Sequence, residues 1–592
     1  MGSWVDPEKI EVRRVAVGAL PVVNAVLDRL GFEELLGDYL PEPDPRCAIA
    51  PAKAIGVLVR NLCVSRRPLY GLSVWARGYE PSLVGLQATD VVRLNDDRVG
   101  RALDQLFAAD RASLLTALSL AVIGRFGVEV RELHNDSTSI VLFGSYREAT
   151  GQARRGVRPP AAERGFSKDH RGDLKQLVEI LTISSDGAVP IAHRLADGST
   201  EDSTTHIATW DQLVAMLGTT DFCYTADCKL ATRDNMEHIA GQGGRFLTIL
   251  PRSRKEDEVG RAWIAAGEVT WEEVARKPGK RKDDPDEVYW AAEAPGCSVE
   301  GFRIVWMRSS DKRSDDAARR FSRIEDARRR LVDLNETLSS TRCRMKTRAS
   351  VDDAVATILK DTGAARFLRA VVADDTTYEH RQEKRGRPGK DTRYRRIAHY
   401  RFSITAHVDE EAVAYDAASD GCFPFVTNET LPPAELLRIY KFQPRLERRH
   451  ATFKGVIEAA PLTLKSDTRL DALGFCLYVA LLVCRSPRHS LYDGLVGPYD
   501  VLGTLYDDCM DAIRAKVTRN GQVSLPAELR RRWAAGSVLV IDRGDYAIVR
   551  PIPTDPLASL RGSHAGPGPA LEQARAAERA TEREREEQSS RR

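Results

Sequence analysis

The spacing of apolar side chains divides the chain into a helical first part and a second part of alternating strands. Over residues 1–127 apolar residues recur three and four positions apart, as from Leu103 to Leu118, which predicts amphipathic helices. Apolar and polar residues then alternate, which predicts a strand over residues 128–134 that ends at Asp136. Two interpretations of the helical part stay open: a domain that binds DNA or dimerises, or one that only packs against the rest of the chain.

Four more stretches predict further strands. The turn Ser185-Asp186-Gly187 joins two of them as a hairpin, because Asp-Gly suits the backbone of a tight turn. Helical stretches separate the later strands, and this order predicts a mixed sheet with helices on its faces. A second acidic residue, Asp227, ends one of these strands. The strands are expected at residues 175–183, 189–195, 222–226 and 246–250.

The alternation is interrupted over residues 256–428, where strand-like stretches mix with a charged helix near residues 315–338. Helices resume at about Pro433, and the first of them carries the polar residues Tyr440, Glu447 and Lys454. The longest apolar run, residues 473–484, has twelve residues and is too short to span a bilayer. It predicts a buried helix, and we expect no membrane partner.

Composition and charge narrow the class of protein. A chain of 592 residues with 42% hydrophobic and 29% charged residues has ordinary globular composition and room for about three to five domains. Lys and Arg total 88 against 85 for Asp and Glu, so the net charge is only +3. A nucleic acid would therefore have to bind to local basic patches and not to the overall charge of the chain. The ten cysteines include no CxxC pair and residues 1–6 lack the pattern of a signal peptide, so we expect a reducing, cytoplasmic location.

Three acidic residues on separate predicted elements form the candidate catalytic and metal site: Asp136, Asp227 and Glu447. Two-metal phosphoryl transfer needs carboxylates that converge from different elements and hold two Mg²⁺ ions about 3.5–4 Å apart. A few carboxylates suffice, because water and phosphate oxygens complete the coordination of Mg²⁺. An acidic trio is easily chosen among 85 acids, and each Asp also suits a strand-end turn or a helix cap.

Motifs around these acids make the choice specific. The third acid lies in Tyr440-x2-Gln443-x3-Glu447-x6-Lys454, the first in HNDST and the second in YTAD, and residues 165–176 and 197–202 read GFSKDHRGDLKQ and DGSTED. These motifs resemble those of DDE transposases of bacterial insertion sequences, in the group with a Y-x2-R-x3-E-x6-K signature. Gln443 stands where that signature has Arg, so one contact of the group with phosphate or DNA is not expected here.

The resemblance covers roughly residues 1–490 and implies a multidomain α/β fold. Its centre would be a ribonuclease-H-like catalytic core, with a β-rich domain inserted between the second Asp and the Glu. The gaps agree, because 91 residues separate the two aspartates and 220 separate Asp227 from Glu447. The expected divisions are a helical N-terminal domain (1–127), the first part of the core (128–255), the insertion (256–428) and the second part of the core (429–490).

The resemblance also implies the activity, which is nicking at the transposon ends and in-line attack of the freed 3′-OH on target DNA. Asp136 and Asp227 would bridge two Mg²⁺ ions, for which Mn²⁺ can substitute, and Glu447 would complete one site. The partners would be double-stranded DNA of the ends and target and, since ends are paired, a second copy of the chain as a homodimer. The predicted DNA contacts, with solvated charge as the alternative for the basic ones, are Tyr440, Lys454, Arg448, Arg449, Lys168, Arg171 and Lys175.

A basic stretch within the insertion is another candidate for contact with DNA. Residues 376–401 carry nine Lys or Arg against three acids, with tyrosines between them. The tetrapeptide Arg385-Gly386-Arg387-Pro388 is the core of an AT-hook, which lays Arg into a narrow minor groove. The alternatives are a solvated loop and general contact of the basic stretch with phosphates.

The end of the chain predicts a small module over residues 513–553. Residues 516–526 have the pattern of a strand, an Asn-Gly turn and a strand, and two more strands are expected at 537–541 and 546–550. The stretch resembles the swapped-hairpin DNA-binding domain of AbrB and MazE, which implies a small β-barrel formed by two copies; a barrel that only dimerises is the alternative. Its predicted DNA contacts are Lys516, Arg519, Arg530 and Arg531, and a charged, flexible tail is expected over 562–592.

Two other functions stay open. A catalytically silent, repurposed transposase would act as a DNA-binding repressor, and a simple Mg²⁺ nuclease would cut without joining. The intact trio of acids favours an enzyme over the repressor, and a joined DNA product would separate transposase from nuclease.

Overall fold

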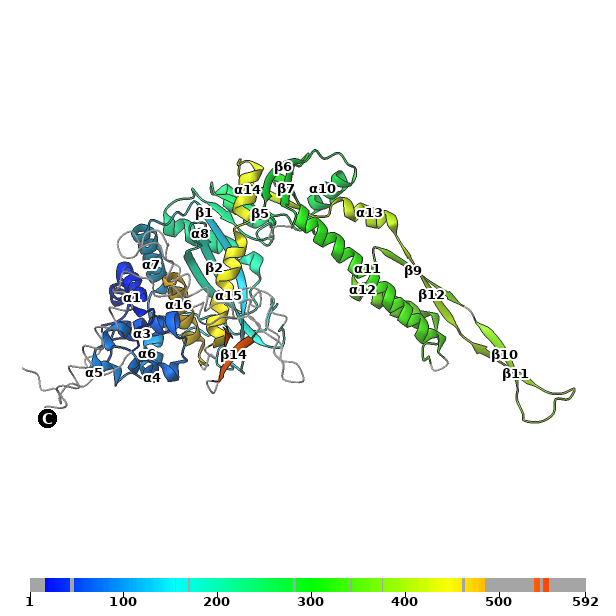
Figure 1. Cartoon of the computed structure of the whole chain (residues 1–592), viewed down its shortest axis with the longest axis horizontal. Coiled ribbons are helices and arrows are strands. Elements are labelled where there is room, and N and C mark those ends of the chain that lie inside the picture. The colour runs from blue at the N-terminus through cyan, green and yellow to red at the C-terminus, as the bar shows by residue number, and fades with distance from the viewer. Residues whose placement is uncertain are drawn as a thin grey trace, which may run out of the picture. The chain divides into compact units, whose positions relative to one another are not determined.

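A computed structural model describes most of the chain (Figure 1). Contacts between residues divide the chain into two units, Met1–Pro498 and Tyr499–Arg592. The described residues are 16–42, 47–154, 156–168, 171–279, 284–340, 343–374, 376–459 and 464–484 in the first unit, with 537–542 and 547–552 in the second.

Helices form the first part of the chain and pack together with the late helix α16 (Asp467–Val483). α16 is apolar on all sides, and such a helix is stable only when neighbours surround it. It contacts α3 and α6, and Arg469 near its start pairs with Asp104 at 2.7 Å. The N-terminal helices are α1 (Leu20–Leu30), α2 (Phe32–Tyr39), α3 (Pro51–Val64), α4 (Leu72–Arg77), α5 (Ala88–Val91), α6 (Asp96–Ala108) and α7 (Arg111–Phe126).

Local signals start these helices where the sequence carries capping residues. The side chain of Asn95 accepts the backbone N–H of Arg98 at the start of α6, and Asp110 accepts that of Ser113 at the start of α7. In the described part of the chain, no single helix is long and apolar enough to cross a membrane. α6 and α7 reach that length and composition only as a pair bent by 92°.

A nine-stranded mixed sheet crosses the described part of the first unit in the order β3-β2-β1-β4-β5-β13-β8-β7-β6. β1 pairs antiparallel with β2 and parallel with β4, and β4 pairs parallel with β5. β13 joins the two halves, because it pairs antiparallel with both β5 and β8. The strands are β1 (Glu132–Leu142), β2 (Lys175–Ser184), β3 (Pro190–Ala196), β4 (Cys223–Thr225), β5 (Arg245–Ile249), β6 (Glu272–Lys277), β7 (Glu287–Glu293), β8 (Arg303–Ser309) and β13 (Cys422–Thr427).

Helices cover this sheet and fix its edges. α15 lies along β1 and β2 (Figure 1). α16 approaches β3 so closely that a Cβ atom on Gly474 would lie 2.5 Å from Cδ1 of Leu195, so a larger residue there would require the Leu195 side chain to shift. The hairpin predicted at Asp186-Gly187 is present between β2 and β3. The helices are α8 (His206–Leu217), α9 (Arg233–Gly241), α10 (Lys255–Ala265), α14 (Pro433–Tyr440) and α15 (Gln443–Ala459).

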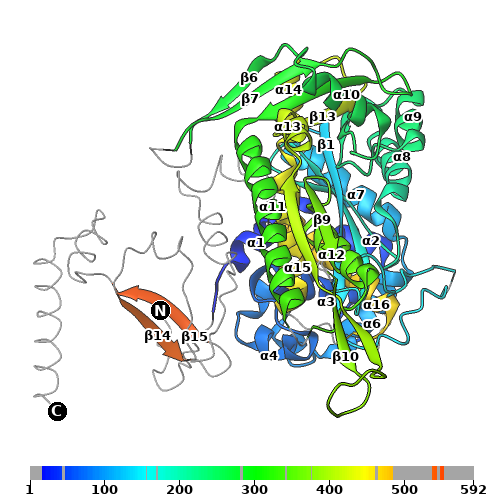
Figure 2. The same cartoon turned by 90° about the vertical axis from the view of Figure 1, so that its right-hand side faces the viewer.

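The insertion between β5 and β13 is mixed in structure, whereas the resemblance implies a β-rich domain. Its first strands extend the main sheet, and α11 then leads into an arm with its own apolar core around Leu331, Val351 and Phe402. Figures 1 and 2 show the hairpin β10–β11 beyond the ends of α11 and α12. The arm consists of α11 (Ser310–Ser339), α12 (Arg348–Thr362), β9 (Leu368–Asp374), β10 (Thr377–Gln382), β11 (Tyr394–His399), β12 (Phe402–Val408) and α13 (Glu410–Ala418).

In the second unit the structure describes one antiparallel hairpin. It consists of β14 (Ser537–Asp542) and β15 (Ala547–Ile552), which confirms the two predicted strands of that segment. The barrel and its exchange between two copies stay predictions. The four predicted DNA contacts of the module lie outside the described residues: Lys516, Arg519, Arg530 and Arg531.

Candidate active site

Asp136 lies inside β1, and Asp227 lies two residues beyond the end of the neighbouring parallel strand β4. β1 and β4 are in register up to the pair His134 and Thr225, and Asp136 and Asp227 each follow that pair by two residues. One expectation was wrong, because Asp136 lies inside β1 and not at its end. β1 continues to Leu142 since its pairing with β2 extends that far.

The backbone around Asp227 fixes its carboxylate. Oδ1 accepts the backbone N–H of Lys229 at 2.9 Å, and the carbonyl oxygen of Asp227 accepts the hydroxyl of Thr248 at 2.6 Å. Burial raises the pKa of this carboxyl group, and the carboxylates of Asp136 and Asp202 raise it further. Negative charge is therefore crowded here, and a bound cation would relieve the crowding.

Lys168 provides a cation between the acids. Its Nζ lies 3.4 Å from Oδ1 of Asp136 and 3.3 Å from Oδ2 of Asp202, and it donates to the carbonyl oxygen of Ser137. Burial alone would lower the pKa of Lys168, but the carboxylates around it, including that of Asp227, raise it. The side chain of Lys168, which was predicted to contact DNA, therefore points toward the acidic cluster. Asp202 was missed, although it ends the DGSTED motif.

Glu447 lies on the face of α15 that is turned toward β1. Gln443, four residues earlier, places Oε1 3.1 Å from Nδ1 of His134. His450, three residues later, places Nε2 3.8 Å from Oδ2 of Asp136. Because residues three and four apart share one helix face, Glu447 lies between these two contacts. Its own side chain is exposed.

Tyr440 marks the neighbourhood that the three acids share. Burial raises the pKa of its phenol, and the carboxylates of Asp227, Asp136 and Glu447 raise it further. The ring packs against Phe425 with a centroid distance of 5.0 Å. The phenol therefore stays protonated at neutral pH and is a hydrogen-bond donor beside the acids.

The donor atoms suit a hard divalent cation, although no three of them are preassembled. Within the ranges that the structure describes, no group of three His, Cys, Asp or Glu side chains is arranged to hold a metal ion. Carboxylate oxygens are nevertheless the ligands that Mg²⁺ prefers. The ammonium group of Lys168 occupies the point on which Asp136 and Asp202 converge. A divalent ion at that point would require this ammonium group to move away.

Gln443 has an internal role at the position where the transposase signature has Arg. It bonds with the ring of His134 and donates to the carbonyl oxygen of Asn135 at 3.4 Å. Burial lowers the pKa of His134 to about 4, so this ring is neutral at neutral pH and matches a neutral amide. His134 is therefore a packed, hydrogen-bonded residue of β1.

A second buried polar group, which sequence reasoning did not select, adjoins Asp136. Glu179 of β2 is fully buried, with Oε2 3.1 Å from Nδ1 of His450 and Oε1 3.8 Å from Nε2 of His193. Burial raises the pKa of the Glu179 carboxyl group, while the nearby His450 lowers it. The signal in the sequence was a lone acid within the apolar run 177–183.

Two adjacent arginines of α15 differ in position. Arg448 is exposed, as a contact with DNA phosphate requires. Arg449 is buried and donates to the carbonyl oxygens of Ala188 at 3.0 Å and Gly187 at 3.1 Å. It therefore ties α15 to the turn between β2 and β3, which indicates a structural role.

The other predicted basic contacts are also partly engaged within the chain. Arg171 is exposed and pairs with Asp173 at 2.8 Å. Lys175 donates to the carbonyl oxygen of Tyr146 at 2.9 Å. Lys454 is half-buried and lies near enough to Glu179 to influence the pKa of that carboxyl group.

The AT-hook tetrapeptide lies on the arm, far from the three candidate acids. Arg385 and Arg387 are exposed in the loop between β10 and β11. Figure 1 shows this loop at the tip of the arm, away from β1. The structure does not bring them to the candidate active site.

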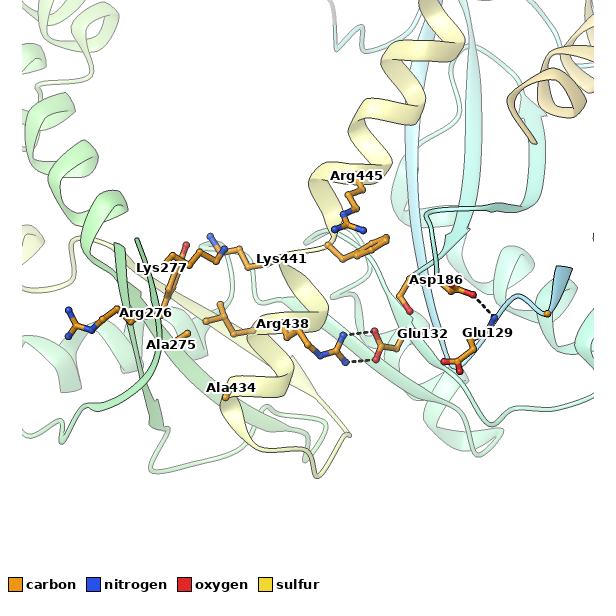
Figure 3. A pocket seen from close by; sticks show the side chains of 15 residues that line it. Glu129, Glu132, Asp186, Ala275, Arg276, Lys277, Ala434, Arg438, Lys441 and Arg445 are labelled. Atoms are coloured by element: carbon orange, nitrogen blue, oxygen red, sulfur yellow. Dashed lines mark hydrogen bonds and ion pairs between the residues drawn. The ribbon is translucent and has the colours of Figure 1, made fainter. Parts of the chain in front are cut away.

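A groove of about 830 Å³ lies at the start of β1, away from Asp136. Figure 3 shows its basic wall with Lys277 and Lys441 and its acidic wall with Glu129 and Asp186. None of the three candidate acids lines it. Because its two walls carry opposite charges, the groove does not suit a polyanion such as DNA.

Comparisons with known proteins give a short family match and several distant matches among solved structures. A family described as a domain of unknown function, DUF4277, matches residues 11–120. No curated protein matches the chain. A piggyBac transposase synaptic complex with hairpin DNA covers 87% of this chain and 90% of its own at 8% identity, with a TM-score of 0.25. A Mos1 transposase paired-end complex with left transposon end covers 38% of this chain and 68% of its own at 12% identity, with a TM-score of 0.14. Scores this low support no conclusion about fold or function.

Proposed function

We propose that the chain is a DDE transposase that cleaves the ends of an insertion sequence and joins the freed 3′-OH to target DNA. The register of β1 and β4 carries the proposal, because it sets Asp136 beside Asp227. Glu447 faces the same place from α15, which lies along β1. The three acids that the transposase signature singles out therefore come from distant segments to one neighbourhood. The strands β3-β2-β1-β4-β5 would form the ribonuclease-H-like core.

The residues around the acids have separate tasks in this proposal. Two Mg²⁺ ions, when bound by the acids, would stabilise the attacking and leaving oxygens of the phosphoryl transfer. Tyr440 donates its phenolic hydrogen to a phosphate oxygen, and Arg448 neutralises phosphates along the exposed side of α15. Lys168 neutralises Asp136 and Asp202 in the metal-free chain and must withdraw before a divalent ion enters.

The remaining parts would supply affinity for DNA. The basic arm hairpin would contact phosphates, with Arg385 and Arg387 at its tip, and the C-terminal module would add a dimeric DNA-binding barrel. A homodimer would hold two transposon ends together, and the protein would act in the cytoplasm on the nucleoid.

One observation favours a second candidate, a catalytically silent transposase that acts as a DNA-binding repressor. In the described residues no three donors are preassembled for a metal, and Lys168 fills the cation position. A chain that never exchanges this ammonium group for Mg²⁺ would bind DNA without cutting it.

Cleavage and joining of labelled DNA that carries the element's terminal repeats would test the proposal. Wild type is compared with Glu447→Gln, with Mg²⁺ or Mn²⁺ and with EDTA. Glu435→Gln is the matched control, because Glu435 is an exposed acid on the neighbouring helix α14. We expect joined product from wild type and the control, and bound but uncut DNA from Glu447→Gln. Cutting without joining would indicate a nuclease, and binding without metal-dependent cutting would indicate the repressor.

A further inference from the structure

A buried chain of polar groups leads from β3 and β2 to the first catalytic acid. Glu179 lies on the same face of the sheet as Asp136, because Leu181, two residues beyond Glu179, is the cross-strand partner of Asp136. His450 reaches both side chains from α15, with Nδ1 3.1 Å from Glu179 and Nε2 3.8 Å from Asp136. The ring of His450 thus stands between two carboxylates.

The burial of Glu179 calls for a physical reason. Its side chain has no exposed surface, and its neighbours along β2 are apolar. A carboxylate in such a place is costly, and an apolar residue of similar size would usually pack there with no loss of stability. Oε2 meets His450, whereas Oε1 has no hydrogen-bond partner among the described residues. Packing alone therefore does not account for an acid at this position.

The contacts of Asp136 suggest that reason, because its two oxygens meet different partners. Oδ1 faces the ammonium group of Lys168 at 3.4 Å, at the candidate cation position. Oδ2 faces Nε2 of His450, a buried atom without a hydrogen-bond partner in the described structure. The contact of Nδ1 with Oε2 of Glu179 orients the ring of His450, and Nε2 then faces Oδ2 of Asp136 at 3.8 Å. The buried ring therefore occupies the Oδ2 side of the Asp136 carboxylate and limits the space in which that carboxylate can rotate.

We propose that Glu179 and His450 are positioning residues that hold Oδ2 of Asp136, so that Oδ1 is presented to the catalytic cation. This inference rests on the proposed function, since it assigns a partner to one of its three acids. Groups that orient a metal ligand from behind typically change metal affinity 10–100-fold when removed. The same range is expected here for the loss of either residue.

Metal-dependent thermal unfolding of the full-length protein tests this inference without a need for catalysis. Mg²⁺ and Mn²⁺ are titrated alone, and the metal concentration at half of the maximal rise in Tm is compared between wild type and variants. Glu179→Gln and His450→Gln are expected to raise that concentration about 10–100-fold. The metal dependence of DNA cleavage should shift by a similar factor, whereas DNA binding in EDTA should not change.

His193→Gln is the matched control. His193 is buried and lies 3.8 Å from Glu179, on the opposite side from Asp136. Its loss disturbs the same buried cluster but leaves the contact between His450 and Asp136 in place. It should lower Tm without metal as much as the other variants do, with no shift in metal affinity.

The outcomes separate this inference from the proposed function. Folded Glu179→Gln with the metal affinity of wild type would overturn the positioning role, and so would an equal shift in His193→Gln. Should Glu179→Gln fail to fold, His450→Gln makes the same comparison. Wild type that binds neither ion would overturn the proposed function, and the positioning role with it.

Discussion

Two charged regions of the first unit differ in how their charges are placed. Around Asp136 most of the charges pair within the chain: Lys168 lies within 4 Å of Asp136 and Asp202, and the buried His450 lies within 4 Å of Asp136 and of the buried Glu179. In the hairpin β10–β11 the side chains are exposed, and Arg381 lies directly opposite Arg395. The first region balances its charges within the chain, whereas the second leaves an excess of positive charge for solvent or a partner.

The difference in burial indicates how much each charged side chain contributes to stability. Removal of one partner from a buried pair costs about 3–5 kcal/mol, because the other charge is left without compensation. An exposed pair contributes about 0–1 kcal/mol and is screened by salt. Substitutions near Asp136 should therefore change fold or chemistry, while substitutions in the hairpin should change only the affinity for a charged partner.

The largest expected effect belongs to the acids themselves. Asp227→Asn should lower cleavage and joining by about 10³-fold or more, since it removes a charge that acts in the transition state. It should not lower Tm in the absence of metal, because burial and then the carboxylates of Asp136 and Asp202 raise the pKa of Asp227, so its charge does not stabilise the fold. Activity and thermal unfolding are measured on the same samples. Asp173→Asn is the control, because Asp173 is an exposed acid. Equal activity of the two variants would show that Asp227 is not part of the active site.

The next effect sharpens the contrast between buried and exposed charge on a single helix. Arg449→Met should reduce the free energy of unfolding by about 2–4 kcal/mol, because the buried carbonyl group of Ala188 and the carbonyl group of Gly187 lose their donor. Arg448→Met, one residue away but exposed, should change it by less than about 0.5 kcal/mol. Urea denaturation measures both, and similar losses would show that burial does not separate the two arginines.

These comparisons also show which features of the structure can be predicted from the sequence. The hairpin at Asp186-Gly187 and a helix that carries Glu447 follow from local patterns, although the expected helix is divided into α14, which ends at Tyr440, and α15, which begins at Gln443. The candidate trio of acids was selected from motifs. The position of Asp136 inside β1 does not, because both faces of that strand are largely buried and the alternation of polar and apolar residues is lost.

Long-range pairs of polar groups are the other part that the sequence does not reveal. Glu179 and His450 are 271 residues apart, and nothing in either local sequence points to the other. Arg448 and Arg449 are the same type of residue on the same helix, and only the packing of α15 on the turn at Gly187 separates their roles. Local pattern predicts elements, whereas the partner of a buried charge depends on the tertiary fold.

The pH dependence of stability offers a smaller effect from a buried neutral group. Burial lowers the pKa of His206 to about 4, from 6.5, and its Nδ1 lies 3.1 Å from the hydroxyl of Tyr224. The unfolded chain therefore takes up the proton first, so stability is complete above pH 6.5 and falls as the pH decreases toward 4. Between about pH 7.5 and about pH 5, His206→Gln should lose about 2 kcal/mol less than wild type.

Urea denaturation at the two pH values measures this difference. His407→Gln serves as the control, since His407 is exposed and should leave the loss at low pH as large as in wild type. A His206→Gln variant with the full loss of wild type would mean that the ring is not held neutral in the folded chain.

The smallest effect concerns the exposed hairpin, where Arg381 and Arg395 face each other across two strands. Like charges placed directly opposite destabilise a strand pair, and a phosphate group between them would remove that repulsion. The double variant Arg381→Gln, Arg395→Gln should reduce the slope of log Kd against log salt concentration by about 2 and weaken DNA binding about tenfold, or about 1.4 kcal/mol, at about 0.15 M salt. Arg328→Gln with Arg330→Gln removes the same charge from α11, where both arginines already pair with acids, so its slope should change less. Equal slopes in the two double variants would mean that net charge alone attracts DNA and that the hairpin has no special part in binding it.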